Sequence, residues 1–212
     1  EPKRLKYVLF YGVPKSRTRA EESVKNPFTL LRVSRLLGIQ VPEEEILGLS
    51  PAEAQAIKIA MITGQSLEGR LGALLEKMKV LVEEAQEALR KVDGTITGET
   101  FQISRKGREV FIEYPDIITY LQGSGRSSRL LNGGLTQGLS VILVDDQVIF
   151  ELFKRKMNFL IPGFAPVNFE ALELDRVKEE IERTRREGGN KVEIKTGLLV
   201  VESPTKAKTI SR

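Results

Sequence analysis

The chain opens on a strand-like hydrophobic pattern. Residues 5–12 are mostly apolar and rich in residues that favour β-structure, and Gly12 and Pro14 end the run. This pattern predicts a buried strand. Because nothing ahead of it can pair with it, we expect the strand to lie in the middle of a domain rather than at its beginning.

The middle of the chain changes to helical periodicity. Helices are predicted over about 26–37, 50–62 and 66–92. Asn26 can cap the first helix, Ser50 opens a capping box for the second, and Ser66 can cap the third, which is long and amphipathic. The sequence therefore predicts a small helical block.

Alternation returns over residues 101–112, on both sides of Lys106-Gly107, and predicts a β-hairpin. The tip of this hairpin carries Arg105, Lys106 and Arg108. A solvated turn would account for these charges. A β-ribbon with a basic tip can also lie along a nucleic-acid groove and contact phosphates, and the sequence leaves both interpretations open.

An α/β rhythm follows Pro115. Strands are predicted over 139–144 and 198–201, and helices over 147–157 and 175–187. The predicted fold class is therefore α/β, with a mainly helical insertion that carries a β-hairpin.

Charge is distributed unevenly along the 212 residues. Lys and Arg number 33 and Asp and Glu 29, so the net charge of +4 does not by itself indicate nucleic-acid binding. Residues 1–19 hold six basic side chains and one acidic, residues 20–103 nine and thirteen, and residues 104–212 eighteen and fifteen. The helical block is thus acidic and both flanks are basic.

The absence of Cys and His excludes several kinds of chemistry. Disulfides, thiol nucleophiles, zinc fingers and imidazole bases are all ruled out. Abundant Glu, Lys and Arg with no Cys also suit a thermophile. The chain has no apolar run of membrane-spanning length and opens without a signal-peptide core, so we expect a cytoplasmic chain without a membrane partner.

The segment 122–129 has the spacing Q-x-x-G-R-x-x-R. Its arginines, Arg126 and Arg129, are three apart on a glycine-loosened turn and can direct two permanently charged planar groups at one anion. In a phosphoryl-transfer site such arginines neutralise charge that develops on the γ-phosphate. The alternative is a basic surface turn.

The segment 198–210 (LLVVESPTKAKTI) places an acid, Glu202, at the end of a predicted strand and Lys206 and Lys208 in the turn of chain that follows. A carboxylate beside ammonium groups suits metal-assisted phosphodiester chemistry. By spacing alone, a structural strand-to-helix turn capped by Ser203 explains the segment equally well.

Both segments resemble known motifs. Residues 122–129 resemble motif VI of superfamily 2 helicases, which implies that Arg126 and Arg129 reach ATP across the cleft between two RecA-like domains and that Gln122 helps to order the cleft. Residues 198–210 resemble the opening of the TOPRIM domain of type IA DNA topoisomerases. This resemblance implies that Glu202 lies in the cleavage centre near Mg²⁺ and that Lys206 contacts the cleaved strand.

The two motifs in this order resemble reverse gyrase. The resemblance implies that residues 1–19 and 114–190 form parts of the second RecA-like domain, that 20–113 are the latch inserted into it, and that 191–212 are a linker and the start of the TOPRIM domain. The implied activity is ATP-dependent, Mg²⁺-dependent introduction of positive supercoils into DNA. The implied partners are DNA and the first RecA-like and topoisomerase domains of the same monomeric polypeptide.

Several parts of such an enzyme are missing from the sequence. It contains no G-x-x-x-x-G-K-[ST] phosphate loop, no TOPRIM D-x-D acids and no tyrosine after Glu202. We therefore expect an internal fragment that is inactive alone and binds ATP weakly or not at all. The alternative is a non-catalytic nucleic-acid-binding or interaction module. In either case the candidate DNA contacts are Lys15, Arg17, Arg19, Arg105, Lys106 and Arg108.

Overall fold

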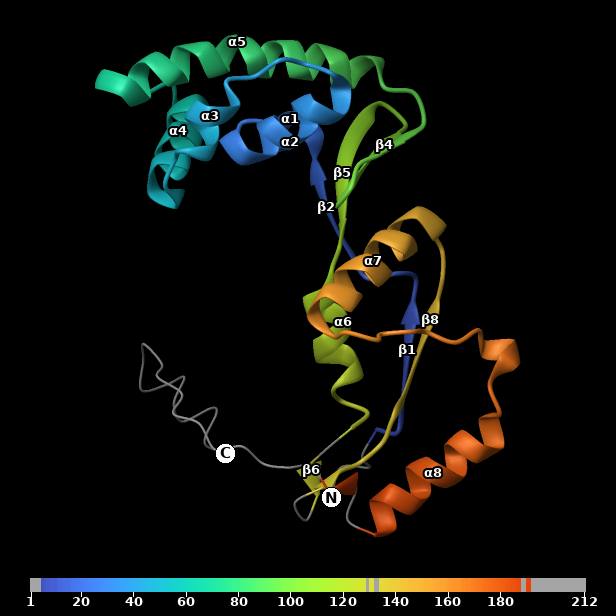
Figure 1. The fold of residues 1–212 in the computed structure, drawn as a ribbon. Helices are drawn as coiled ribbons and strands as arrows, with labels where there is room; N and C mark the ends of the chain where they lie inside the picture. Colours follow the sequence, from blue (N-terminus) through green and yellow to red (C-terminus); the bar gives the residue numbers. More distant parts are fainter. Residues whose placement is uncertain (1–4, 129, 132–133, 188–189, 192–212) are drawn as a thin grey trace. The chain divides into compact units, whose positions relative to one another are not determined.

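The computed structural model describes residues 5–128, 130–131, 134–187 and 190–191, and the chain divides into two compact units (Figure 1). Of the described residues, the smaller unit comprises 5–8, 124–128, 130–131, 134–140, 170–187 and 190–191, and the larger unit comprises 9–123 and 141–169. The mixed α/β class expected from the sequence is confirmed. Among the described residues no helix has the length and apolar character needed to cross a membrane.

A four-stranded antiparallel sheet lies at the centre of the larger unit. Its order is β2 (Lys15–Arg19), β5 (Glu109–Pro115), β4 (Gln102–Lys106) and β3 (Thr95–Thr97). The predicted hairpin is confirmed: β4 and β5 pair around Gly107, whose φ of 63° belongs to the left-handed region that favours glycine. The strand β2 was not predicted, because its sequence KSRTR has no apolar alternation.

Five helices follow β2 in the chain, before β3, and pack against this sheet (Figure 1). They are α1 (Ala20–Ser23), α2 (Pro27–Leu37), α3 (Glu43–Leu47), α4 (Pro51–Thr63) and α5 (Gly69–Lys91). Asn26 caps α2 by accepting from two backbone N–H groups, and Ser50 and Glu53 form the expected capping box of α4.

The predicted start of the long helix α5 at Ser66 is wrong. The helix begins at Gly69, because Leu67 turns in to pack against the hydrophobic core. The carbonyl oxygen of Leu67 lies 2.2 Å from the position that a Cβ on Gly72 would occupy, so the chain folds back closely on the first turn of α5.

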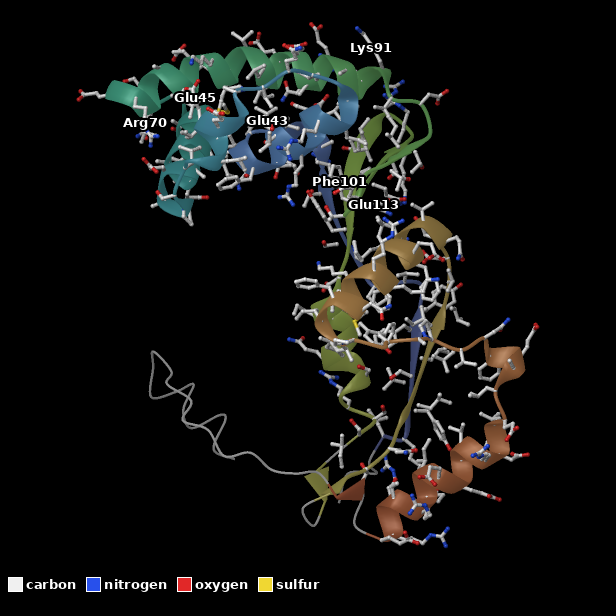
Figure 2. The ribbon with its side chains drawn as sticks, viewed as in Figure 1. Glu43, Glu45, Arg70, Lys91, Phe101 and Glu113 are labelled. Atoms are coloured by element: carbon white, nitrogen blue, oxygen red, sulfur yellow. The ribbon has the colours of Figure 1, made fainter. Side chains whose placement is uncertain are left out.

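One continuous core joins the helices to the sheet. Leu30 of α2, Ile57 of α4, Leu75 of α5 and Ile112 of β5 are all fully buried in it. Ion pairs between helices surround this core, including Arg35 with Glu43, Arg70 with Glu53 and Lys77 with Glu45 (Figure 2). The register Lys15↔Pro115 brings the two ends of this layer together, so we name residues 15–115 the insertion.

A second, smaller core lies in the rest of the larger unit. The helices α6 (Ile117–Ser124) and α7 (Gln147–Leu160) pack through Tyr120, whose ring centroid is 5.0 Å from that of Phe153 and 5.2 Å from that of Phe10. The predicted helix at 147–157 is thus confirmed, whereas α6 was not predicted.

Two paired strands, β1 (Tyr7–Tyr11) and β8 (Leu139–Leu143), contribute residues to both units. Both strands were predicted. The burial expected for the first is wrong, because Tyr7, Leu9 and Tyr11 are exposed in the described chain. Strand β1 has β8 as its partner in a two-stranded sheet and keeps one row of side chains open to solvent.

The smaller unit holds α8 (Leu174–Arg186) and a sheet of order β6 (Leu130–Leu131), β7 (Gly134–Leu135) and β9 (Asn190–Lys191). The 3-10 turn η1 (Phe169–Ala171) precedes α8. On α8, Lys6 pairs with Glu182, and the hydroxyl oxygen of Thr184 accepts from the backbone N–H of Gln137. The helix predicted at 175–187 is confirmed.

Candidate nucleotide and nucleic-acid sites

The glutamine and the first arginine of the Q-x-x-G-R-x-x-R segment are exposed. Gln122 lies near the end of α6, and Arg126 lies in the turn that follows it. Asp116, just before α6, accepts from the backbone N–H and the hydroxyl of Thr119, and these hydrogen bonds lower the pKa of the Asp116 carboxyl. Arg129 lies outside the described residues.

The turn around Arg126 is held through its backbone. The backbone N–H and the hydroxyl of Ser127 both donate to the carbonyl of Ser124, at 3.0 and 2.7 Å. Ser127 is buried while Arg126 is exposed. The turn is thus fixed on its inner side and presents a guanidinium outward, as contact with an anion requires.

The polar face of the four-stranded sheet centres on Glu113 (Figure 2). Its carboxylate is buried and accepts from Gln102 Nε2 at 2.8 Å, Ser104 Oγ at 2.9 Å and Arg17 Nε at 2.7 Å. Lys106 Nζ lies 3.2 Å from the same carboxylate. Arg17 and Gln102 are the cross-strand partners of Glu113 on β2 and β4, so sheet register alone aligns them.

These donors decide the protonation state of Glu113. Burial acts to raise the pKa of its carboxyl, but hydrogen bonds from Gln102, Ser104, Arg17 and Lys106 outweigh it and lower the pKa to about 2. Glu113 is therefore a buried carboxylate that stays charged. Sequence reasoning missed it, although a lone acid within an alternating apolar strand was a usable signal.

This network extends to the start of α7. Gln102 Nε2 also donates to Asp146 Oδ2 at 2.7 Å, and Asp146 caps α7 by accepting from the backbone N–H of Ile149. Lys15 Nζ lies 2.7 Å from Asp145 Oδ2, and Asp145 also accepts from the N–H of Val13. The insertion is thus tied by polar contacts to the loop between β8 and α7.

Most of the candidate DNA contacts are engaged within the protein. Lys15 pairs with Asp145, Arg17 and Lys106 pair with Glu113, and Arg19 pairs with Glu109 at 2.8 Å. The exposed pair of Arg19 with Glu109 can be exchanged for a phosphate contact at low cost, whereas Arg17 and Lys106 would leave the buried Glu113 without its cationic partners.

Arg105 and Arg108 differ sharply although they flank the same turn. The Arg105 guanidinium donates to the carbonyls of Leu89, Arg90 and Val92 at the end of α5, where a cation also opposes the negative end of the helix dipole. Arg108 is exposed and makes no ion pair with any described residue. It therefore keeps its charge available to an outside anion.

A shallow basic pocket lies beside the hairpin tip, with a volume of about 150 Å³. It is lined by Arg19, Arg90, Arg105 and Arg108 together with Glu21, Glu22, Glu109 and Val110. The acidic side chains reduce the positive charge of the pocket, because Arg90 pairs with Glu21 and Arg19 pairs with Glu109. Arg108 contributes positive charge to this pocket and pairs with no acid in the described part of the chain.

The candidate metal and cleavage residues Glu202 and Lys206 lie outside the described residues. In the described parts of the chain, no group of three or more acidic side chains could hold a metal ion.

No protein-family model matches the chain. The chain is similar over its whole length to reverse gyrase 2 of Sulfolobus acidocaldarius, with 47% identity, and to reverse gyrase 1 of Sulfurisphaera tokodaii, with 35%, covering 19% of each. Reverse gyrase of Pyrococcus horikoshii is 34% identical over 99% of the chain and 15% of its own length.

The resemblance to reverse gyrase seen in the motifs is therefore confirmed. The chain corresponds to a segment of a reverse gyrase and spans about a fifth of the length of the curated relatives it matches.

Proposed function

We propose that this chain is the part of a reverse gyrase that couples ATP-driven motion of its helicase-like region to strand passage by its type IA topoisomerase region. The observation that carries the proposal is similarity along the whole chain to reverse gyrases. In this proposal the α/β parts around the insertion belong to the second RecA-like domain, residues 20–113 of the insertion are the latch, and residues 191–212 lead into the TOPRIM domain.

Within that function, Arg126 and Arg129 contact the phosphates of ATP, and Gln122 orders the same cleft. Exposure of Arg126 on a backbone-fixed turn supports this role. Because the chain lacks a phosphate loop, the remaining ATP contacts come from the first RecA-like domain of the same polypeptide.

Mutation of the turn in the intact enzyme tests this assignment. Arg126→Ala should reduce DNA-stimulated ATP hydrolysis by at least about a hundredfold, the scale seen when a charge-stabilising group is removed from a transition state. Arg176→Ala, which changes an exposed arginine of α8 paired only with Glu173 in the described structure, is the matched control. Equal rates of ATP hydrolysis by the two variants would show that Arg126 does not contact ATP.

Glu202 and Lys206 are proposed to serve DNA cleavage, with Glu202 near a Mg²⁺ ion and Lys206 against the cleaved strand. The proposal rests on the sequence V-V-E-S-P-T-K alone. Glu202→Gln in the intact enzyme should abolish relaxation of negatively supercoiled DNA while leaving ATP hydrolysis in place. Retained relaxation would exclude Glu202 from the cleavage centre.

DNA contact by the insertion is a further part of the proposal, with Arg108 at the hairpin tip as its strongest candidate. The unpaired charge of Arg108 supports it. The second candidate function, a non-catalytic nucleic-acid-binding module, shares this surface but predicts no effect of Arg126 on ATP turnover. The enzyme is proposed to act as a cytoplasmic monomer.

A further inference from the structure

One arginine of α8 holds the backbone of the arginine turn. Arg185 Nη2 donates to the carbonyl of Ser127 at 2.9 Å and to the carbonyl of Leu5 at 2.6 Å. Ser127 directly follows Arg126 in the chain. The guanidinium of Arg185 thus binds the main chain of the turn at the residue next to Arg126, the proposed ATP contact.

Gly138 also packs closely against the carbonyl of Ser127. A Cβ built on Gly138 would lie 2.3 Å from this oxygen and 2.4 Å from the Ser127 hydroxyl, a distance that real Cβ atoms do not reach. Only glycine at position 138 permits this approach. Gly138 and Arg185 therefore fix the same peptide group.

The helix that carries Arg185 is anchored to the same stretch of chain. Ile181 and Thr184 of α8 are buried, and the Thr184 hydroxyl oxygen accepts from the backbone N–H of Gln137 at 3.0 Å. Gln137 adjoins Gly138. A displacement of α8 would therefore shift both contacts to Ser127 together.

We propose that Arg185 is a positioning residue for the nucleotide-facing turn and that α8 sets the orientation of Arg126. This inference rests on the proposed function of Arg126. It assigns a regulatory role to α8, because α8 lies in the chain between the arginine turn and the segment that holds Glu202. Movement of the topoisomerase region can then alter ATP hydrolysis through one hydrogen-bonded helix.

The first test uses steady-state ATP hydrolysis by the intact, DNA-saturated enzyme. Arg185→Gln should lower kcat about tenfold and change KM for ATP by less than about twofold, because a misplaced arginine loses contacts made mainly in the transition state. Arg185→Lys, which can reach one of the two carbonyls, should restore part of kcat. Arg176→Ala on the same helix should hydrolyse ATP normally.

Gly138→Ala gives an independent route to the same effect without changing Arg185. It should displace the Ser127 carbonyl and lower kcat to a similar extent. Normal kcat in both Arg185→Gln and Gly138→Ala, alongside impaired Arg126→Ala, would overturn the positioning role and leave the proposed function intact. Normal kcat in Arg126→Ala would overturn both.

The double variant separates positioning from general stability. If Arg185 acts through Arg126, then Arg126→Ala with Arg185→Gln should be no slower than Arg126→Ala alone, because the positioned group is already gone. A further tenfold loss in the double variant would show that Arg185 acts independently of Arg126 and would overturn the inference.

Discussion

The insertion and the α/β parts that flank it differ in how much hydrophobic core each contains. The insertion buries residues from α2, α4, α5 and the sheet in one core. Among the described residues the second core has only six buried side chains, and β1 leaves Tyr7, Leu9 and Tyr11 exposed. A segment whose own helices cover its apolar face can fold as a unit. The insertion is thus structurally self-sufficient, and the α/β parts carry the motifs but less of their own support.

The polar links between these regions show how a self-sufficient segment can still be coupled. On one face of the sheet, Ile103 and Ile112 face the helices, and on the other, Gln102 and Glu113 contact charged groups. The apolar face stabilises the insertion, and the polar face connects it to Asp146 at the start of α7. One sheet thus packs on the helices through one face and contacts the start of α7 through the other.

The largest expected effect comes from removing the insertion. The backbone N–H of Asp116 donates to the carbonyl of Pro14 at 2.8 Å, so a short Gly-Ser linker can replace residues 15–115 without displacing either end. In the intact enzyme this deletion should abolish ATP-driven positive supercoiling while sparing ATP hydrolysis and relaxation of negative supercoils. Topoisomer gels measure the outcome.

A control for the deletion inserts the same linker at Gly107, at the hairpin tip, and keeps the insertion. This variant should supercoil normally. Undiminished positive supercoiling by the deletion variant would show that the insertion does not couple the two halves of the enzyme.

Core substitutions test whether the two regions unfold separately. Leu75→Ala should destabilise the insertion by about 2–5 kcal/mol, and Phe153→Ala should destabilise the second core by about 3–5 kcal/mol. In denaturant titrations of the chain, each should shift its own transition only. Val80→Ala, at an exposed position of α5, should change stability by less than about 0.5 kcal/mol. A single transition moved by both core variants would contradict self-sufficiency.

Acid should weaken the insertion through Glu113. Its pKa is lowered to about 2 in the folded chain, so the carboxylate stabilises the fold above its unfolded value of 4.5, and this contribution is lost as pH falls from 4.5 towards 2. The shift corresponds to about 3 kcal/mol. Glu113→Gln should flatten the fall in thermal stability over this window, whereas Glu109→Gln, at an exposed pair, should not. Identical pH profiles for wild type and Glu113→Gln would exclude this role.

The sequence predicted elements that local rules determine. Asn26, Ser50 and Gly107 mark their helix and turn boundaries by caps and a left-handed φ, and these positions were found. Strand β2 and the role of Glu113 were missed, because KSRTR becomes a strand only by pairing with β5, a contact nearly a hundred residues away in sequence. Both β2 and the hydrogen bonds of Glu113 depend on pairing between distant strands, which the hydrophobic periodicity of the sequence does not reveal.

For the arginine turn, the sequence predicted which residue types could contact an anion but not the contacts that hold the turn in place. Arg126 is exposed, and its contact with ATP stays a prediction. The contacts of Arg185 and Gly138 with the Ser127 carbonyl could not be predicted from the sequence, because they involve the backbone rather than a recognisable side-chain motif. Likewise, Arg105 and Arg108 look equivalent in sequence, and only the structure assigns one to the end of α5.

That difference between Arg105 and Arg108 gives the smallest expected effects. Arg105→Ala removes hydrogen bonds to three carbonyls at the end of α5 and should lower the stability of the insertion by about 1–2 kcal/mol. Arg108→Ala should leave thermal stability unchanged and weaken DNA binding by about two- to fivefold at low salt, while reducing the slope of log affinity against log salt by about one.

Fluorescence anisotropy with a labelled DNA duplex and thermal unfolding of the same samples measure both quantities. A stability loss without an affinity change in Arg105→Ala, and the reverse in Arg108→Ala, would assign one arginine to folding and the other to DNA. Unchanged affinity and salt slope in Arg108→Ala would instead favour the solvated turn. The hairpin would then serve only as the two central strands of the insertion's sheet, and the DNA contacts would have to come from elsewhere in the enzyme.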